Sequence, residues 1–423
     1  MCDNRQPLKV CLDARVISGE SGGIEQVIIG LAYGLSRLTE RGEEFLFLTC
    51  PGADAWVRPH IGGPCRTLPS SARPLTLQRG RAGKCFVSLV RMARKMAIVL
   101  CGRAGVRIPR SDGTIERAHI DVMHFTRQSA FLTGTTSIYH PWDLQHLHVP
   151  QFFSRRECLL RETLYRRFCD QAGLVVAANR WTRQDIIERY ELPEEKVRVV
   201  RCAPVLAVYP SPSESDLARA KEELALPPAY VFYPARTWKH KNHMGLLEAL
   251  AILRDRHQSE VVAVFSGGRT EFATQIERRA RELRVIDQVR FLGLVSPFQL
   301  HCLYKLCRCV VFPTMFEGLG MPLIEAFWAG APIACSNVAS LAEEAGSAAL
   351  LFNPLRPVEI AEAILRLWRD EGLRSAMAGR GRERVSGLSW NLTARAFRAH
   401  YRQMSGRTLT LEDRALLAQA ASA

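Results

Sequence analysis

Two glutamates, Glu317 and Glu325, lie on either side of a turn rich in glycine and proline. An apolar run, 310–312, precedes the turn, and Pro322 suits the first turn of a helix. We therefore expect Glu317 at the carboxyl end of a strand and Glu325 inside the following helix. Ligands of open α/β sheets bind at the carboxyl ends of strands. Two carboxylates there suit a polyhydroxylated ligand, because each accepts several hydroxyl hydrogen bonds. The alternative is a capped junction whose glutamates are merely solvated.

A second feature is the resemblance of this stretch to a known family. Residues 317–332 read EGLGMPLIEAFWAGAP. The run resembles the E-x7-E signature of the retaining nucleotide-sugar glycosyltransferases of family 4, usually written close to EGFGLPxLEAMAxGxP. The resemblance covers roughly Leu8 to Tyr401 and is strongest from Tyr230 onward. It implies that Glu325 binds the donor ribose, while Glu317 and the backbone amides of the turn hold the sugar. Those amides belong to Gly318, Leu319 and Gly320.

The elements that must position these residues form two α/β series. Apolar strands alternate with helices from Leu8 to Ala177, and again from Tyr230 to Cys335. This alternation predicts two Rossmann-like, doubly wound parallel-sheet domains. It agrees with the GT-B architecture that the resemblance implies, in which the two domains face a cleft. We place the acceptor-binding domain at 1–208, the nucleotide-sugar-binding domain at 209–388, a helix crossing back at 389–404 and a loose tail at 405–423.

A cationic turn follows the first strand of the second domain. Arg236 and Lys241 stand five residues apart in it, as they do in the family's pattern. An arginine forks onto phosphate oxygens and a lysine acts as a point charge, so both can stabilise a leaving diphosphate. The resemblance assigns Arg236 and Lys241 catalytic and donor-binding roles. A solvated basic turn is the alternative.

Glycine loops supply further candidates. Gly22 and Gly23 let the backbone approach a bulky ligand, and they resemble the glycine pair that lines the donor diphosphate in the family. By themselves they are also compatible with an ordinary turn. Val295 follows the strand near Phe291 and stands where the family's backbone contacts the nucleobase.

A cluster of histidines follows a strand of the first domain, within residues 139–148. His140 ends the strand, and related enzymes place a histidine here toward the acceptor and donor sugar. We therefore take His140 as a catalytic candidate. Asp143 and His146 are assigned to the acceptor region, and His146 is the second choice for the histidine's role. Trp142 departs from the family pattern, and a purely structural role for these histidines is the alternative.

The composition is that of a soluble globular chain of 423 residues, with 47% hydrophobic and 23% charged residues. We see no signal peptide and no membrane-spanning run, and thirteen cysteines fit reduced thiols in the cytoplasm. We expect no metal and no bound cofactor. His301, Cys302, Cys307 and Cys309 are close in sequence but are assigned to core packing.

The net charge of +15 is unevenly distributed. Ten Lys or Arg residues and no acid lie between Arg73 and Arg110, and 84–100 reads as a basic amphipathic helix. Such helices bind anionic membrane surfaces. A second cationic run lies at 155–167. Nucleic acid is disfavoured because we find no aromatic stacking platform. A solvated helix face is the remaining alternative.

These observations favour a retaining, metal-independent hexosyltransferase that uses a nucleotide-diphosphate sugar. We expect it in the cytoplasm, on or near the membrane, with a lipid-linked glycan or polysaccharide precursor as acceptor. The alternatives are another GT-B activity, such as an epimerase or inverting transferase, and a catalytically silent nucleotide-sugar binding protein. A dehydrogenase is disfavoured because the first glycine loop lacks the GxGxxG spacing. The sequence does not identify the sugar, the base, the acceptor, the linkage or the oligomeric state.

Overall fold

The computed structural model describes residues 6–19, 22–40, 42–71 and 106–422. The basic helix expected at 84–100 lies outside these residues. None of the helices in the described part of the chain has the length and apolar content of a membrane span.

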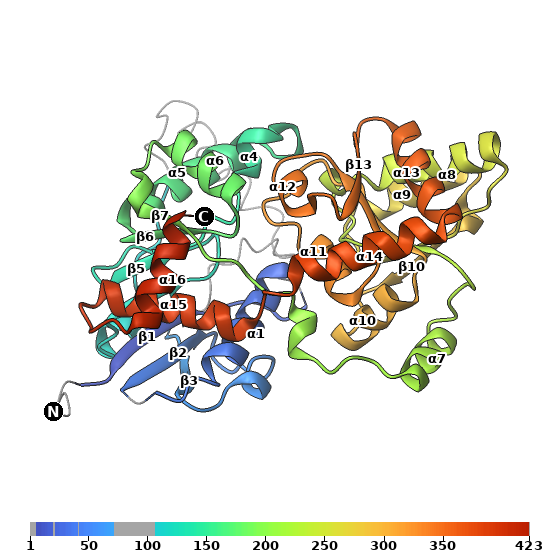
Figure 1. The fold of residues 1–423 in the computed structure, drawn as a ribbon. Helices are drawn as coiled ribbons and strands as arrows, with labels where there is room; N and C mark the ends of the chain where they lie inside the picture. Colours follow the sequence, from blue (N-terminus) through green and yellow to red (C-terminus); the bar gives the residue numbers. More distant parts are fainter. Residues whose placement is uncertain (1–5, 20–21, 41, 72–105, 423) are drawn as a thin grey trace.

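The first domain is built on a parallel seven-stranded sheet of order β3-β2-β1-β4-β5-β6-β7 (Figure 1). Every strand pair in the sheet is parallel, and parallel pairing requires crossover connections. The strand order reverses at β1, so a crevice opens beside its carboxyl end. The strands are β1 (Leu8–Asp13), β2 (Glu43–Thr49), β3 (Cys65–Pro69), β4 (Val122–Phe125), β5 (Thr136–Tyr139), β6 (Leu174–Ala177) and β7 (Val197–Val199). The helices are α1 (Gly23–Leu35), α3 (Thr114–Arg117), α4 (Gln145–His148), α5 (Arg155–Gln171) and α6 (Arg180–Tyr190), with short 3-10 turns η1 (Arg58–His60), η3 (Pro150–Phe152), η4 (Glu194–Lys196) and η5 (Val205–Val208).

The second domain repeats this plan with a six-stranded sheet of order β10-β9-β8-β11-β12-β13. Its order reverses at β8, so the loops after β8 and β11 meet at one crevice. The strands are β8 (Val231–Pro234), β9 (Ala263–Ser266), β10 (Val289–Gly293), β11 (Cys309–Phe312), β12 (Ile333–Ser336) and β13 (Ala349–Phe352). The helices are α7 (Glu214–Glu223), α8 (His243–His257), α9 (Ala273–Glu282), α10 (Pro297–Leu306), α11 (Met321–Ala329), α12 (Leu341–Ala345), α13 (Pro357–Arg369) and α14 (Glu371–Val385), with η6 (Lys239–Lys241) and η7 (Ile286–Gln288). The predicted fold class, two Rossmann-like parallel-sheet domains, is confirmed.

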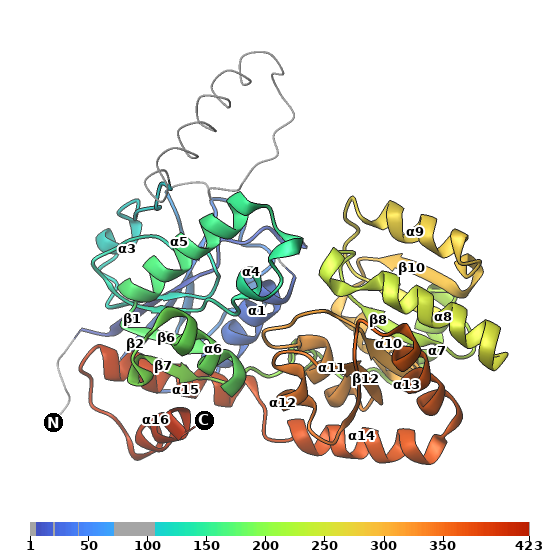
Figure 2. The same cartoon turned by 90° about the horizontal axis from the view of Figure 1, so that it is seen from above.

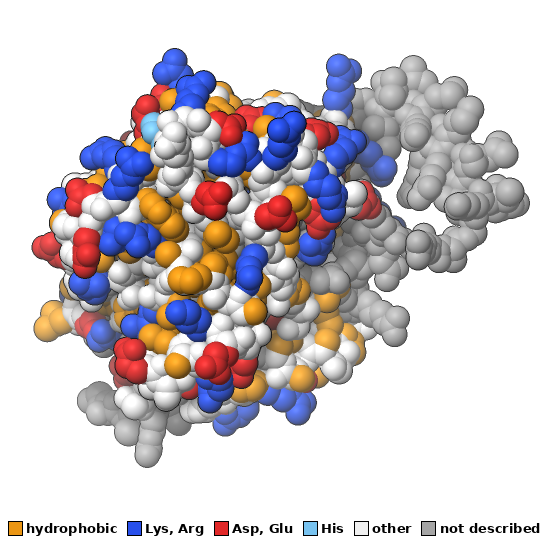
Figure 3. All heavy atoms as spheres, turned by 90° about the vertical axis from the view of Figure 1, so that its right-hand side faces the viewer, with side chains coloured by type: hydrophobic (Ala, Val, Ile, Leu, Met, Phe, Trp, Pro, Cys, Tyr) orange, Lys and Arg blue, Asp and Glu red, His pale blue; other side chains and the backbone are white. Residues whose placement is uncertain are grey.

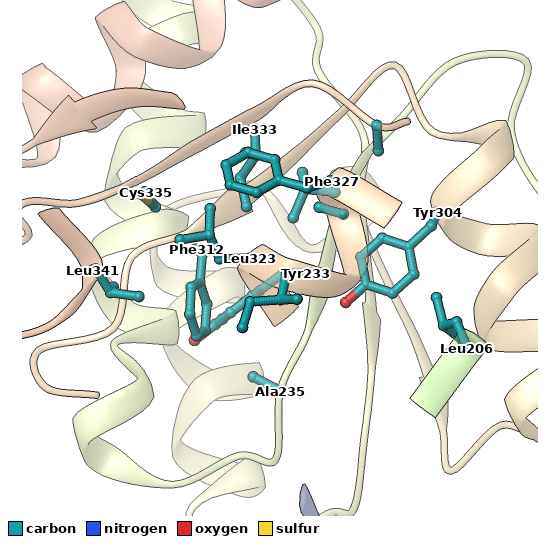
Figure 4. Close-up of a cluster of buried hydrophobic side chains, with 14 of the residues drawn as sticks. Leu206, Tyr233, Ala235, Tyr304, Phe312, Leu323, Phe327, Ile333, Cys335 and Leu341 are labelled. Carbon is teal, nitrogen blue, oxygen red and sulfur yellow. The ribbon is translucent and has the colours of Figure 1, made fainter. Parts of the chain in front are cut away.

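The core of the second domain lies between its sheet and α11. Figure 4 shows Leu323 and Phe327 of α11 among side chains from β8, β11 and β12, with Tyr304 of α10 beside them. This packing fixes the helix that carries Glu325. His301, Cys302 and Cys309 are buried in the same region as core side chains, as expected. The outer end of the domain carries interspersed acidic and basic side chains, typical of a solvated face (Figure 3).

Helix α15 (Trp390–Met404) returns to the first domain and packs on α1 (Figures 1 and 2). Gly30 and Gly34 of α1 make room for Trp390, because a side chain at either position would collide with it. The Trp390 indole N–H donates to the Pro204 carbonyl over 3.0 Å. The long crossing therefore ties the end of the second domain to the first.

The expectation of a loose tail at 405–423 is wrong. Residues Leu411–Ser422 form helix α16, which packs on α15. The Thr410 hydroxyl accepts from the Asp413 N–H over 3.0 Å, so Thr410 begins the helix. The buried Asp413 carboxylate pairs with Arg402 of α15 at 2.8 Å. The Thr-x-x-Asp spacing is typical of a helix start and could be recognised in the sequence. Arg402, which pairs with Asp413, lies on another helix.

Candidate active site

The loops after β8 and β11 bring Lys241 and Glu317 together. The Lys241 ammonium pairs with Glu317 Oε1, and the Thr314 hydroxyl donates to the same oxygen over 3.1 Å. The two side chains are only 15% and 14% exposed. Met315 N–H donates to the His240 carbonyl over 2.8 Å, which joins the two loops. The cation and carboxylate therefore stand at the crevice where the strand order reverses.

Local backbone geometry explains the position of Lys241. It ends the turn η6, and Asn242 follows in the left-handed conformation with φ of 57°. The Asn242 side chain accepts from Gly245 N–H over 3.1 Å and caps α8. Asparagine tolerates this conformation better than most residues. The cap thus sets where the lysine leaves the backbone.

Arg236 lies in the same crevice, directly after β8. Its guanidinium carbon is 5.2 Å from the Trp238 ring centroid, a cation–π distance. A Cβ at Gly268 would stand 3.1 Å from Arg236 Nε, so the glycine after β9 leaves room for the guanidinium. Arg236 and Lys241 therefore come from one loop after β8, and Lys241 is the one that contacts Glu317.

Glu325 is separated from this group and sits inside α11. It is 5% exposed, and one carboxylate oxygen accepts from the Tyr304 hydroxyl over 2.8 Å. Burial raises the Glu325 pKa to about 7, and the hydrogen bond from Tyr304 lowers it by a smaller amount. The helix start that positions it is Gly320, in the left-handed conformation with φ of 74°.

Replacing Glu325 by glutamine should flatten the pH dependence of stability. The native state keeps a proton on Glu325 between pH 4.5 and about 7, whereas the unfolded chain releases it. The stabilisation from this proton is therefore complete below pH 4.5 and lost as pH rises through 7. The difference amounts to about 3 kcal/mol at its limit. Urea unfolding of both proteins from pH 5 to 8 measures it, and parallel curves would contradict the assignment.

Gly318 is the point at which the first domain contacts the signature loop. Its carbonyl accepts from Asn179 Nδ2 and from Thr182 Oγ1, both over 2.8 Å. A Cβ at Gly318 would lie 2.6 Å from the Trp142 carbonyl oxygen and from Asp143 Cβ. The backbone next to Glu317 is therefore held against the first domain.

Asp143 lies across the domain boundary from Glu317 and Lys241. Burial raises its pKa to about 6, with Glu317 raising it further and Lys241 and Arg161 lowering it. Asp143 Oδ1 accepts from Gln145 N–H over 3.0 Å. Two carboxyl groups and a lysine thus share one electrostatic environment at this boundary.

Polar residues of α6 and α12 complete the boundary. The Glu343 carboxylate accepts the N–H groups of Arg180 and Trp181, over 3.2 and 2.8 Å, at the start of α6. Arg201 pairs with Glu344 at 2.9 Å. Sequence reasoning missed Asn179, Thr182 and Glu343. Asn179 is readable as a helix cap, but its second partner lies 139 residues away.

The histidines take different positions. His140 is 2% exposed and bonds through Nε2 to His124 over 2.8 Å, and burial lowers its pKa to about 3. His146 pairs instead with Glu162 at 3.2 Å and packs on Tyr165. His148, which the sequence did not single out, stacks on Phe316 with ring centroids 5.1 Å apart. It adds a second contact across the boundary.

The remaining predicted residues occupy loops around the crevices. Gly22 has φ of 55° and Gly23 begins α1, where a Cβ at either would meet nothing within 4 Å. Glu25 folds the preceding loop back by accepting from the Ser18 hydroxyl and Gly19 N–H, over 2.8 and 2.9 Å. Val295 and Leu319 are half-buried against the core. The glycine loop thus leaves space for a ligand.

Comparison with known proteins identifies the second domain. The model of the family described as glycosyl transferases group 1 matches residues 214–384. These residues contain Arg236, Lys241, Glu317 and Glu325. The second domain is thus similar to the glycosyl transferases group 1 family, and we call residues 214–384 the group 1 domain. The matched residues include the second sheet, the cationic turn and both glutamates.

Curated relatives align over more than the group 1 domain. An Escherichia coli protein named O-antigen chain mannosyltransferase B is 29% identical over 264 residues, which are 61% of this chain and 68% of that protein. A D-inositol 3-phosphate glycosyltransferase of Corynebacterium jeikeium is 29% identical over 258 residues, 58% of this chain and 62% of that protein. The chain therefore spans about two thirds of each relative.

Solved structures share the whole two-domain fold. Anabaena Alr3699/HepE, solved in complex with UDP and glucose, has a TM-score of 0.67 and 18% identity, covering 94% of this chain and 100% of that one. WaaG, a glycosyltransferase involved in lipopolysaccharide biosynthesis, has a TM-score of 0.64 and 16% identity, with coverage of 94% and 100%. The group 1 domain and its partner domain thus form a GT-B architecture.

Proposed function

We propose that this chain is a retaining glycosyltransferase that moves a hexose-type sugar from a nucleotide diphosphate to an acceptor between its two domains. The observation that carries the proposal is the Lys241–Glu317 pair in the group 1 domain, with Lys241 on the same loop as Arg236. Names of the relatives favour a mannosyl or glucosyl donor. Such a donor offers a diphosphate to the cations and hydroxyl groups to the carboxylates.

The Lys241–Glu317 pair points to an exchange of partners on donor binding. A diphosphate carries more charge than Glu317 and would draw Lys241 away from it. Glu317 would then be free to accept hydrogen bonds from the sugar hydroxyls. Arg236 and Lys241 would stabilise the charge that develops on the leaving diphosphate, without the need for a metal ion. Glu325 would accept the ribose hydroxyls.

Closure of the first domain would complete the site. Asn179 and Thr182 hold the Gly318 carbonyl, so the Glu317 backbone reaches its position only when the domains meet. Asp143 approaches the same place from the acceptor side. The site would thereby exclude water, which limits hydrolysis of the donor.

A lipid-linked glycan or cell-envelope polysaccharide precursor is the acceptor class we propose. Relatives named for O-antigen synthesis favour it. Arg155, Arg156 and Arg167 of α5 are exposed cations on the first domain. With the basic segment outside the described residues, they would attract the anionic cytoplasmic membrane face. Sedimentation with anionic vesicles at low and high salt tests this, and a salt-independent bound fraction argues for a soluble acceptor.

A panel of nucleotide sugars tests the function. The correct donor at a hundred times its Kd should stabilise the native state by about 2.7 kcal/mol, seen as a rise in melting temperature. Glu325→Ala should lose this rise, whereas Glu317→Ala should keep most of it and lose turnover. Anomeric analysis of the product separates retention from inversion. A donor that binds without transfer or hydrolysis would favour the silent binding protein, and an epimerised donor would favour the epimerase.

A further inference from the structure

A chain of three buried side chains joins the crossing helix α15 to the end of β5. Tyr401 Oη lies 2.6 Å from His124 Nδ1, and His124 Nε2 lies 2.8 Å from His140 Nε2. The two imidazole rings have centroids 4.9 Å apart and planes inclined by 25°, and Phe397 of α15 packs on both. All three polar side chains are almost fully buried. The geometry therefore links a residue of α15 to His140, the catalytic candidate of the sequence analysis.

The three groups are neutral near pH 7. Burial lowers the pKa of His140 to about 3 and that of His124 well below its ordinary value. Burial also raises the pKa of Tyr401 well above its ordinary value. A neutral imidazole carries one proton on one of its two nitrogens. The hydrogen bond between the two Nε2 atoms therefore has one donor ring and one acceptor ring.

Tyr401 decides which ring donates. Within the described residues, its hydroxyl has His124 as its only hydrogen-bond partner. If it accepted from His124, its own proton would stay buried without a hydrogen-bond acceptor, which is unfavourable. The 2.6 Å separation also suits an O–H donor better than an N–H donor, which prefers about 2.9 Å. Tyr401 therefore donates to His124 Nδ1.

The other two proton positions follow from this bond. With Nδ1 accepting, neutral His124 carries its proton on Nε2 and donates it to His140 Nε2. His140 must then hold its own proton on Nδ1. In the described part of the chain this Nδ1 has no hydrogen-bond partner, and unlike Nδ1 of His146 and His243 it is not fully buried. The small exposed part of His140 thus includes Nδ1.

We propose that Tyr401 and His124 are positioning residues that lock His140 as the Nδ1–H tautomer, which offers one hydrogen-bond donor to an oxygen of the bound ligand. The loop after His140 reaches Gly318 within three residues, at Trp142 and Asp143. The identity of this oxygen, as part of a sugar hydroxyl or a phosphate, rests on the proposed function. In this tautomer the exposed nitrogen cannot accept a proton, so His140 orients the ligand rather than acting as a base.

Nuclear magnetic resonance of the ligand-free full chain tests the tautomer. Two-bond ¹H–¹⁵N correlations of ¹⁵N-histidine-labelled protein distinguish Nδ1–H from Nε2–H, and loss of signals in His124→Asn and His140→Asn assigns them. We expect Nδ1–H for His140 and Nε2–H for His124. Tyr401→Phe should convert the His140 signal to a mixture of both tautomers. Tyr139→Phe removes another buried hydroxyl, bonded to the Gln128 carbonyl, and should leave both signals unchanged.

Two outcomes would overturn the proposal. One is a wild-type His140 protonated on Nε2; the other is an unchanged spectrum in a folded Tyr401→Phe protein. Turnover supplies a second readout: asparagine places an N–H near Nδ1 and glutamine near Nε2. The kcat of His140→Asn should therefore be at least about tenfold higher than that of His140→Gln. If both variants lose kcat equally, His140 does not act as an Nδ1–H donor. If His140 carries Nδ1–H and His124 carries Nε2–H but the protein transfers no sugar, the proposed function is wrong, and the tautomer assignment remains supported.

Discussion

Arg236→Ala and Lys241→Ala should each lower kcat by about 10²–10³-fold, the loss seen when one charge-stabilising donor is removed from an active site. Both cations would act on the same diphosphate, since they leave one loop beside Glu317. The double variant should therefore lose less than the product of the two single losses. Steady-state kinetics with the identified donor measures all three. Fully multiplicative losses would argue against a shared phosphate.

Stability must be separated from catalysis at Lys241, because its removal leaves the half-buried Glu317 carboxylate without its cation. Lys241→Ala combined with Glu317→Gln should recover thermal stability but not turnover. Lys239 is a matched control: it is an exposed cation in the same turn, 5.8 Å from the Phe272 ring. Lys239→Ala should change kcat by less than about threefold, as a surface cation does. A large loss there would point to a general charge effect.

Gly318→Ala should lower kcat/KM by about 10²-fold or more, the effect of moving reacting groups by roughly 1 Å. The new Cβ would stand 2.6 Å from the Trp142 carbonyl oxygen and Asp143 Cβ, so the domains must separate. The bonds from Asn179 and Thr182 to the Gly318 carbonyl would then lengthen or break. Gly318 lies in the loop between β11 and α11 and in neither sheet, so the melting temperature should change little.

Kinetics together with small-angle scattering measures this effect, since separated domains increase the radius of gyration. Gly379→Ala on α14 is the matched control, because a Cβ there meets nothing within 4 Å. It should leave kinetics unchanged and stabilise the helix by up to about 1 kcal/mol. Wild-type kinetics in Gly318→Ala would show that contact at Gly318 is not required for turnover.

Several features of this protein were readable from local patterns. The alternation of apolar strands with helices predicted two parallel sheets. It was readable because strands and helices each impose their own period on the apolar residues. Lys241 and Glu317 each follow a strand, and parallel pairing places such strand ends on one edge. Their meeting was therefore a consequence of topology.

Partner choice across the fold was decided by the tertiary structure. Glu325 was expected inside a helix as a ligand of the donor ribose, and only the packing of α11 against α10 shows that it is buried against Tyr304. Gly318 read as a turn residue, and only domain contact reveals Asn179 and Thr182 as its partners. These pairs are separated by 21 to 139 residues.

The Tyr401–His124–His140 chain and helix α16 make the same point. His124 and Tyr401 are 277 residues apart, and each reads locally as an ordinary core residue of a strand or helix. Asp413 reads as part of a helix start, but its burial depends on Arg402. Local sequence determines periods, caps and strand ends through backbone energetics. Which buried polar groups meet depends on packing between distant elements, where an unpaired group is costly and the fold must supply its partner.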